Sequence, residues 1–340
     1  MTPARFAEIT DRYASLRLAL VGDFCLDRYL EIDPARGETS IETGLPVHNV
    51  VRVRSQPGGA GTILNNLAAL GVGAIHPVGF CGEDGEGYEL QRALAQVPGV
   101  QGNLLVTPLR RTFTYCKPLV VAPSEPPVEL NRLDSKNWTP TPPAVEQALA
   151  ACLVPKDEPP AAIVVLDQVD VAETGVVTTQ MLAALRRLGA LNPQLRILGD
   201  SRRGLSDWPP ITFKMNLAEL SRMTSLSANA GLLEIGQAAA ALARQNQREV
   251  FVTLAERGIV GASPDGHAFH RPALPVRGPI DVVGAGDSVS ANLATALAAH
   301  ATLPDAMELA MAAAHRVVHQ LGTTGTASVP ELQAILGCNP

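Results

Sequence analysis

Short apolar runs alternate with runs of helical spacing along most of the chain. Residues 16–21 (LRLALV) and 161–166 (AAIVVL) are continuous apolar segments of the length that buried strands have. Residues 62–70 and 178–188 have helical spacing, and a glycine follows each of them. The same reasoning predicts further strands at 74–79, 196–199 and 249–253, and further helices at 87–95 and 288–300. This alternation predicts βαβ units, and therefore a mostly parallel sheet with helices on both faces.

Two stretches interrupt this rhythm. Residues 28–56 alternate polar and apolar positions without helical spacing, and residues 107–134 have the same character. Such alternation is typical of strands with one exposed face. We expect the two stretches to form a small β lid that projects from a single α/β domain of residues 1–340.

Composition narrows the class of protein. The 340 residues carry a net charge of −6 and are 46% hydrophobic, which excludes a disordered or fibrous chain. Mild acidity and 4% aromatic residues argue against a nucleic-acid partner. No apolar run approaches the ~18 residues of a membrane span, and residues 1–17 lack the apolar core of a signal peptide. We therefore expect a cytoplasmic protein without a membrane partner, with its five scattered cysteines reduced.

The strongest chemical signal is the segment DVVGAGD at 281–287, which precedes an alanine-rich helical run. The small residues Gly284, Ala285 and Gly286 leave backbone N–H groups open at the positive end of the helix dipole. Such a site stabilises phosphate oxygens and the charge that develops during their transfer. Asp287 is placed to accept a proton from an attacking hydroxyl beside that site. The alternative is an aspartate that only caps the helix after a glycine turn.

The segment resembles the C-terminal signature of the ribokinase-like (PfkB) carbohydrate kinases, in which the last aspartate is the catalytic base. Three more elements resemble motifs of this family and occur in its order. They are the di-glycine turn at 58–65 (GGAGTILN), the N-x-x-E motif within 214–219 (KMNLAE) and the nucleotide loop at 253–258 (TLAERG). Together the four elements span nearly the whole chain and are specific. The resemblance implies a three-layer α/β sandwich with a mostly parallel central sheet and a small β lid.

Within the family, the chain is most similar to the kinases that phosphorylate D-glycero-β-D-manno-heptose 7-phosphate at O1. Residues 21–29 (VGDFCLDRY) are similar to their opening VGD-x-x-LDRY, residues 131–134 (NRLD) to their LRLD, and residues 321–323 to their terminal LGT. In several bacteria a nucleotidyltransferase domain follows this kinase. The 340 residues leave no room for one beside the expected kinase domain.

The resemblance implies transfer of the ATP γ-phosphoryl group to a sugar hydroxyl, with Asp287 as base and the amides of 284–287 as anion site. It also implies an acceptor site. Asp23 and Asp27 follow a strand, where ligands bind in open α/β sheets, and are expected to accept hydrogen bonds from sugar hydroxyls. Solvated turn residues are the alternative. Gly58, Gly59 and Thr62 complete the expected acceptor site.

The implied cofactors are ATP and Mg²⁺. Asn216 and Glu219, three residues apart, share a helix face and suit the hydration shell of Mg²⁺, unless they only start an exposed helix. Lys214 is a candidate to neutralise nucleotide phosphate, and Thr253 and Gly258 belong to the expected nucleotide loop.

Two further expectations come from the resemblance. Asp281 and the Val283 carbonyl would form a monovalent-cation site, with K⁺ as the candidate ion. Two lids would pair across a two-fold axis to form a homodimer. Basic residues in or beside the lid are also candidates to hold a substrate phosphate, because guanidinium groups match phosphate well: Arg28, Arg110, Arg111, Lys117 and Arg132.

Several positions depart from the family pattern. Ala255 replaces a nucleotide-loop glycine, Thr62 an asparagine, and Met311 an asparagine near the adenine. Residues 200–202 read Asp-Ser-Arg in place of Asp-Pro-Lys, and residues 167–169 replace an Asp-Tyr-x-Lys-Gly segment. These changes affect the acceptor and adenine sites more than the chemical centre.

Three alternatives therefore stay open. The acceptor of the kinase is a heptose phosphate or another compound, such as fructose 6-phosphate, a pentose or a nucleoside. A degenerate kinase fold that senses a nucleotide or sugar is the second alternative. A dehydrogenase is the weakest, because residues 58–61 lack G-x-G-x-x-G spacing. The histidine pairs His315/His319 and His267/His270 have no third metal ligand in the sequence.

Overall fold

An eight-stranded sheet forms the centre of the computed structural model, which describes residues 1–123, 126–153, 159–322 and 324–338. The strand order is β17-β16-β15-β14-β13-β12-β1-β6. Neighbours from β6 to β15 are parallel, whereas β16 is antiparallel to both of its neighbours, β15 and β17. The strands are β1 (Arg17–Gly22), β6 (Ala74–Val78), β12 (Ala162–Asp167), β13 (Arg196–Ser201), β14 (Thr212–Asn216), β15 (Val250–Thr253), β16 (Ile259–Ala262) and β17 (Ala268–Arg271).

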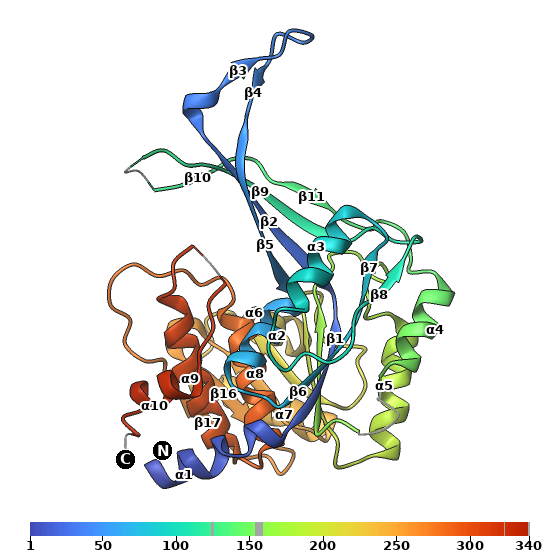
Figure 1. The fold of residues 1–340 in the computed structure, drawn as a ribbon. Helices are drawn as coiled ribbons and strands as arrows, with labels where there is room; N and C mark the ends of the chain where they lie inside the picture. Colours follow the sequence, from blue (N-terminus) through green and yellow to red (C-terminus); the bar gives the residue numbers. More distant parts are fainter. Residues whose placement is uncertain (124–125, 154–158, 323, 339–340) are drawn as a thin grey trace.

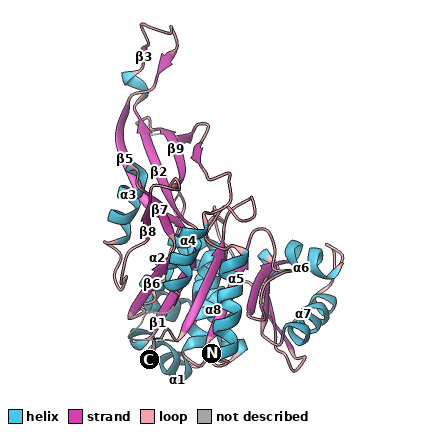
Figure 2. Ribbon diagram, turned by 90° about the vertical axis from the view of Figure 1, so that its right-hand side faces the viewer, coloured by secondary structure: helices cyan, strands magenta, loops and turns pink. Residues whose placement is uncertain are grey.

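Helices cover both faces of this sheet (Figures 1 and 2). Alternate residues of β1 enter two separate apolar cores: Leu18 and Leu20 pack on one face, Ala19 and Val21 on the other. This is why the central strands read as continuous apolar runs. One core includes residues of α1 (Pro3–Thr10), α2 (Ala60–Ala69), α3 (Gly85–Leu94), α8 (Ala285–Ala298), α9 (Leu303–Val318) and α10 (Val329–Ile335). The other includes α4 (Pro143–Ala151), α5 (Thr179–Leu191), α6 (Leu217–Thr224) and α7 (Leu232–Asn246).

The expected three-layer α/β sandwich is thus confirmed, with local differences. The helix predicted to stop at Gly189 continues to Leu191, because Gly189 keeps helical geometry and the chain turns only at Asn192. The antiparallel pair β16–β17 was not expected, since its short strands carry little periodicity. None of the described helices is long and apolar enough to cross a membrane.

A second sheet projects from the carboxyl edge of the first, at the top of Figure 1. We call it the lid sheet; it consists of β2 (Phe24–Ile32), β5 (Val50–Gly59), β9 (Phe113–Val120), β10 (Val128–Glu129) and β11 (Leu133–Ser135). β2 pairs antiparallel with β5 and parallel with β9. Both stretches predicted for the lid contribute strands, but β2 already begins at Phe24, directly after β1.

Smaller pairs complete the strands. A narrow arm, β3 (Glu38–Thr39) with β4 (Pro46–Val47), extends from the far end of the lid sheet. β7 (Phe80–Gly82) pairs in parallel with β8 (Leu105–Thr107) beside α3.

The parallel strands bring polar residues to one edge of the central sheet. Asp23 follows β1, Gln168 follows β12, Arg202 follows β13, and Asn216 ends β14. Helix α8 begins at Ala285, and residues of its first turn line the same region. The carboxyl edge of an open α/β sheet is where ligands bind, so the fold directs attention to this region.

Candidate active site

A cavity of about 440 Å³ lies at this edge, between the lid sheet and the start of α8. Its size is that of ordinary ligand sites, and charged side chains dominate its wall. The residues that carry its chemistry are Asp27, Gly59, Thr62, Tyr115, Lys117, Arg132, Lys136, Gln168, Asp200, Arg202, Lys214, Glu219, Gly284, Gly286 and Asp287.

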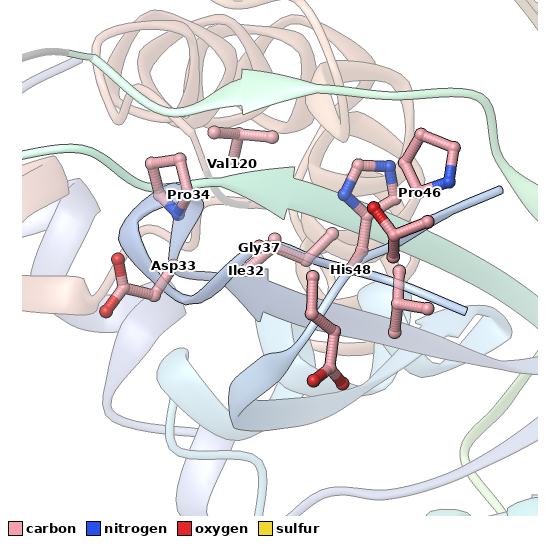
Figure 3. A pocket seen from close by; sticks show the side chains of 10 residues that line it. Ile32, Asp33, Pro34, Gly37, Pro46, His48 and Val120 are labelled. Atoms are coloured by element: carbon pink, nitrogen blue, oxygen red, sulfur yellow. The ribbon is translucent and has the colours of Figure 1, made fainter. Parts of the chain in front are cut away.

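A second hollow of about 370 Å³ lies at the far end of the lid sheet, where Ile32, Pro34, His48 and Val120 line it (Figure 3). Its Asp33 carboxylate already accepts the Ala35 N–H at 3.0 Å and pairs with an adjacent arginine. Glu38 and His48 also line this hollow, but it lies away from the carboxyl edge of the central sheet, where ligands bind in open α/β sheets. We take the cavity at the sheet edge as the candidate active site.

Asp287 stands in the first turn of α8 and lines the cavity. Burial and then the nearby Asp200 carboxylate raise the pKa of its carboxyl to about 7, although Lys214 and Arg202 act in the opposite direction. The cap of the helix is Gly284, so Asp287 is not the capping residue. A carboxyl group that titrates near neutrality suits a general base.

The backbone before Asp287 forms an open helix start. Gly284 has φ +82°, a conformation that favours glycine. A Cβ on Gly286 would lie 3.2 Å from Lys214 Nζ, so the small residue allows the lysine to approach. The Ala285 N–H donates to the Val282 carbonyl at 3.2 Å, so one of the four amides of the expected anion site already has a backbone partner.

A buried ion pair supports the floor of the cavity. Lys214 Nζ lies 2.7 Å from Asp200 Oδ2, and the Ser290 hydroxyl donates to the same oxygen at 3.0 Å. Burial acts to lower the pKa of Lys214, but Asp200 and then Asp287 and Glu219 hold it above its ordinary value. The lysine is therefore a fixed positive charge beside the anion site.

Asn216 and Glu219 form a capping box at the start of α6. Asn216 Oδ1 accepts the Glu219 N–H at 2.9 Å, and Glu219 Oε2 accepts the Asn216 N–H at 2.7 Å. Glu219 keeps its second oxygen for the cavity, and burial raises the pKa of its carboxyl. One carboxylate oxygen beside phosphate groups and water is a donor set that fits Mg²⁺. Asn216 positions Glu219 and is itself largely exposed.

The expected acceptor residues divide into two groups. Asp27, Gly59 and Thr62 line the cavity, and Lys117 Nζ lies 3.4 Å from Asp27 Oδ1. A Cβ on Gly58 would fall 2.8 Å from the Asp27 carboxyl carbon, so a larger residue there would displace the Asp27 side chain.

Asp23, in contrast, is not part of the described cavity lining. It is 1% exposed, and its two oxygens accept the N–H groups of Val176 and Gln168 at 2.7 and 2.8 Å. A Cβ on Gly59, where φ is +57°, would fall 2.4 Å from the Asp23 carbonyl oxygen. The structure thus makes Asp23 a support for the segment after β12. Its contact with a sugar hydroxyl stays a prediction.

The basic residues predicted to hold a substrate phosphate also fall into two sets: some line the cavity, and the others bind other parts of the protein. Lys117 and Arg132 line the cavity. Arg28 pairs with Glu89, Arg111 lies beside Asp84, and Arg110 donates to the backbone carbonyls of residues 139, 140 and 174. Two cavity cations were missed, Lys136 and Arg202. Lys136 lies just beyond residue 134, where the lid was expected to end. In the sequence, Arg202 stands out only as a departure from the family pattern.

The expected nucleotide loop is the turn between β15 and β16. Thr253 Oγ1 donates to the Met215 carbonyl at 3.3 Å, and a Cβ on Gly258 would fall 2.0 Å from the Arg271 carbonyl oxygen. Neither residue is part of the described cavity lining. Met311 is buried in α9. Roles for these residues at the nucleotide stay predictions.

Asp281 and Val283 precede the anion site. Asp281 Oδ1 accepts the Val283 N–H at 3.0 Å, and the Asp281 N–H donates to the Val318 carbonyl at 2.8 Å. Among the described residues, no group of three or more His, Cys, Asp or Glu side chains is arranged to hold a metal ion.

Ala255 keeps the conformation that a glycine would adopt, with φ +51°. This conformation costs an alanine about 1–2 kcal/mol. Ala255→Gly removes that strain but adds about 0.5–1 kcal/mol of chain entropy to the unfolded state. We expect the free energy of unfolding to stay unchanged or to rise by up to about 1.5 kcal/mol. Ala241→Gly, at an exposed position in α7, should lower it by about 1 kcal/mol in the same denaturant titration. Equal losses in the two variants would contradict strain at Ala255.

Comparison with known proteins agrees with the fold. The chain superposes on ribokinase of Arabidopsis thaliana, complexed with ribose and ATP, with a TM-score of 0.64 and 17% identity over 95% of this chain and 98% of the other. Phosphofructokinase-2 of Escherichia coli, in complex with potassium, gives a TM-score of 0.68 and 19% identity over the same shares of the two chains. The fold is therefore ribokinase-like.

Sequence comparison gives the family. Residues 129–330 match the model of the pfkB family carbohydrate kinases. The bifunctional protein HldE of Hyphomonas neptunium is 32% identical over 98% of this chain, and that of Gluconacetobacter diazotrophicus is 33% identical over 95%. The chain spans 66% and 64% of these relatives' own lengths. The chain belongs to the pfkB family of carbohydrate kinases and is a phosphotransferase with a hydroxyl group as acceptor.

Proposed function

We propose that this kinase transfers the γ-phosphoryl group of ATP to a hydroxyl of a sugar phosphate, with D-glycero-β-D-manno-heptose 7-phosphate, at O1, as the first candidate. The observation that carries the proposal is the position of Asp287. Its carboxyl titrates near neutrality and lies at the open start of α8, in one cavity with Lys214 and the lid cations.

The mechanism follows from this arrangement. The acceptor hydroxyl lies against Asp287, which takes its proton as the oxygen attacks the γ-phosphorus and the bond to the β-phosphate oxygen breaks. The amides of Gly286 and Asp287, together with Lys214, stabilise the charge on the transferring group. Mg²⁺, when bound, supplies positive charge to the phosphates, and Glu219 is the residue that would hold it or its waters. Asp27 orients the sugar from the lid side.

Two lines of support favour a phosphorylated acceptor. Relatives that are 32–33% identical over nearly the whole chain share one name, bifunctional protein HldE, and the chain has the opening that resembles heptose 7-phosphate kinases. Four cations besides Lys214 also line the cavity: Lys117, Arg132, Lys136 and Arg202.

We extend the proposal to an ion and to a second subunit. Asp281 and the Val283 carbonyl are proposed to hold K⁺ next to the anion site.

The lid sheet exposes Val51, Val53, Val128 and Leu133, and we propose that two copies pair through this sheet. Light scattering tests the second point, and a monomer at assay concentration would contradict it.

The function is tested by ADP release with MgATP and K⁺. The acceptors are heptose 7-phosphate, fructose 6-phosphate, free heptose, ribose and adenosine. We expect the highest kcat/KM with heptose 7-phosphate. Turnover with adenosine or ribose alone would contradict a phosphorylated acceptor. ATP binding with no turnover on any acceptor would favour a nucleotide sensor over a kinase.

A further inference from the structure

Gln56 joins the lid sheet to the segment between α9 and α10. Its side-chain Nε2 donates to the Thr324 hydroxyl oxygen at 3.1 Å, although the two residues are 268 positions apart in the chain. Gln56 stands in β5, whereas Thr324 follows α9 and lines the cavity. The contact therefore connects the lid sheet to the wall of the candidate active site.

Neighbouring strands of the lid sheet hold the Gln56 amide in place. Gln56 lies directly opposite Asp27 in the β2–β5 pair, and its Nε2 lies 3.5 Å from the Tyr29 hydroxyl oxygen. Lys117 Nζ lies 3.3 Å from the same hydroxyl and 3.4 Å from the Asp27 carboxylate. Burial raises the pKa of Asp27, while Lys117 and, more weakly, a hydrogen bond from Gln56 oppose that rise. The amide is thus fixed before a substrate binds, which reduces the entropy that binding would cost.

The segment that carries Thr324 is fixed from the body of the protein. The Gln320 side chain accepts the Thr326 N–H at 3.0 Å and donates to the Thr326 carbonyl at 2.8 Å. A Cβ built on Gly284 would lie 3.5 Å from Thr324 Cβ, so Thr324 packs beside the residue that caps α8. Thr324 therefore contacts the lid through its hydroxyl and lies next to the anion site.

The Gln56 contact decides where the Thr324 hydroxyl can donate. A hydroxyl has one hydrogen and two lone pairs, and an amide NH₂ group can only donate. One lone pair of Thr324 accepts the Gln56 hydrogen, and among the described residues this hydroxyl donates to no protein atom. Its hydrogen has to point away from Gln56 and stays available to an acceptor in the cavity.

We propose that the Thr324 hydroxyl donates a hydrogen bond to the transferring phosphoryl group, and that Gln56 is the positioning residue that orients it. The inference rests on the proposed transfer at the start of α8 and adds a side-chain donor to the backbone amides there. The oxygens of the transferring group carry negative charge, and a donor that is oriented beforehand stabilises this charge without reorganisation.

Calorimetry with the full chain tests this contact without an acceptor. MgADP is titrated alone and together with aluminium fluoride, which takes the place of the transferring phosphoryl group. We expect aluminium fluoride to tighten the binding of ADP to the wild type. Thr324→Val keeps the shape of the side chain without its hydroxyl. It should lose about 10–100-fold of that gain and change the affinity for ADP alone less than about 3-fold. Thr324→Ser should keep most of the gain.

Gln56 variants test the orientation of the hydroxyl. Gln56→Leu should lose about 10-fold of the gain, because the hydroxyl is then free to rotate. Gln56→Glu keeps the size of the side chain but offers an acceptor to the Thr324 hydrogen, so it should lose at least as much. In the double variant Gln56→Leu/Thr324→Val, the loss should exceed that of Thr324→Val by less than about 3-fold, because Gln56 acts through Thr324.

Thr326→Val is the matched control. Thr326 is a half-buried threonine of the same segment, outside the described cavity lining, and its two bonds with Gln320 are made by its backbone. The control should bind both ligands as the wild type does. Thermal melting checks that all variants keep the fold.

The outcomes separate this contact from the proposed function. No gain from aluminium fluoride in the wild type, an unchanged gain in Thr324→Val, or losses that add up in the double variant would each overturn the inference. Normal ADP release by Thr324→Val with the acceptors named above would overturn it as well and leave the proposed transfer. A gain that depends on Thr324 and Gln56, with no ADP release by the wild type on any acceptor, would keep the contact and contradict the proposed transfer.

Discussion

Asp287→Asn is expected to lower kcat by about 10²–10⁴-fold and to leave the affinity for ATP nearly unchanged. The amide has nearly the shape of the carboxylate but cannot accept the proton of the attacking hydroxyl. The backbone amides of α8 and the Lys214 charge remain in place, so the nucleotide phosphates keep their partners. Steady-state ADP release and calorimetric titration with a non-hydrolysable ATP analogue measure the two effects separately.

The pH dependence gives this prediction a second readout. Because burial and then Asp200 raise the pKa of Asp287 to about 7, the carboxyl is neutral below that pH and becomes a base above it. The wild-type kcat/KM should therefore rise as the pH increases through about 7, and the residual rate of Asp287→Asn should lack this rise.

Asp11→Asn is the matched control, since Asp11 is an exposed carboxylate after α1, near the amino end of β1. It should behave as the wild type does. Near-normal turnover in Asp287→Asn would remove Asp287 from the role of base.

Lys214→Met is expected to lower the free energy of unfolding by about 3–5 kcal/mol, because it leaves the buried Asp200 carboxylate without its cation. Asp200 keeps the Ser290 hydroxyl at 3.0 Å, which does not neutralise a charge. The double variant Lys214→Met/Asp200→Asn should recover most of the loss, since no buried charge is then left alone. Denaturant titrations of the two single variants and the double variant measure the coupling. Equal destabilisation in the single Lys214 and double variants would contradict it.

The same lysine affects the chemistry. Lys214 lowers the pKa of Asp287, so its removal should move the rise of kcat/KM to higher pH. A drop in kcat should accompany the shift, because the transferring group loses a fixed positive charge. A purely structural lysine would change stability and leave the pH profile where it was.

Much of the fold could be predicted from the local spacing of apolar and polar residues along the chain. The runs at 16–21 and 161–166 are mostly apolar because β1 and β12 have helices on both faces, and the strands predicted there are found. The lid was predicted from alternation at 28–56 and 107–134, although its strands start earlier and end later than that pattern. Short segments such as β16 and β17 take their structure from neighbours that are distant in the sequence, which local spacing does not report.

The positions of the candidate site residues could be predicted best where they depend on backbone geometry. Gly59 and Gly284 adopt positive φ, and Asp287 follows directly in the first turn of α8. Long side chains were less predictable because their partners come from other elements. Arg110 reaches backbone carbonyls of residues 139, 140 and 174 instead of the cavity, while Arg202 and Lys136 line the cavity from separate segments. Thr323, part of the matched terminal segment, lies outside the described residues.

The most direct test of the account is a single-turnover experiment with γ-³²P-labelled ATP, Mg²⁺ and heptose 7-phosphate. Enzyme is in excess over ATP, so that one event per nucleotide is followed. The account predicts that the label appears in a sugar bisphosphate at the same rate as ADP forms, and that Asp287→Asn slows both. Label that appears only in inorganic phosphate, or equal rates in the wild type and in Asp287→Asn, would contradict transfer to a sugar hydroxyl at this site.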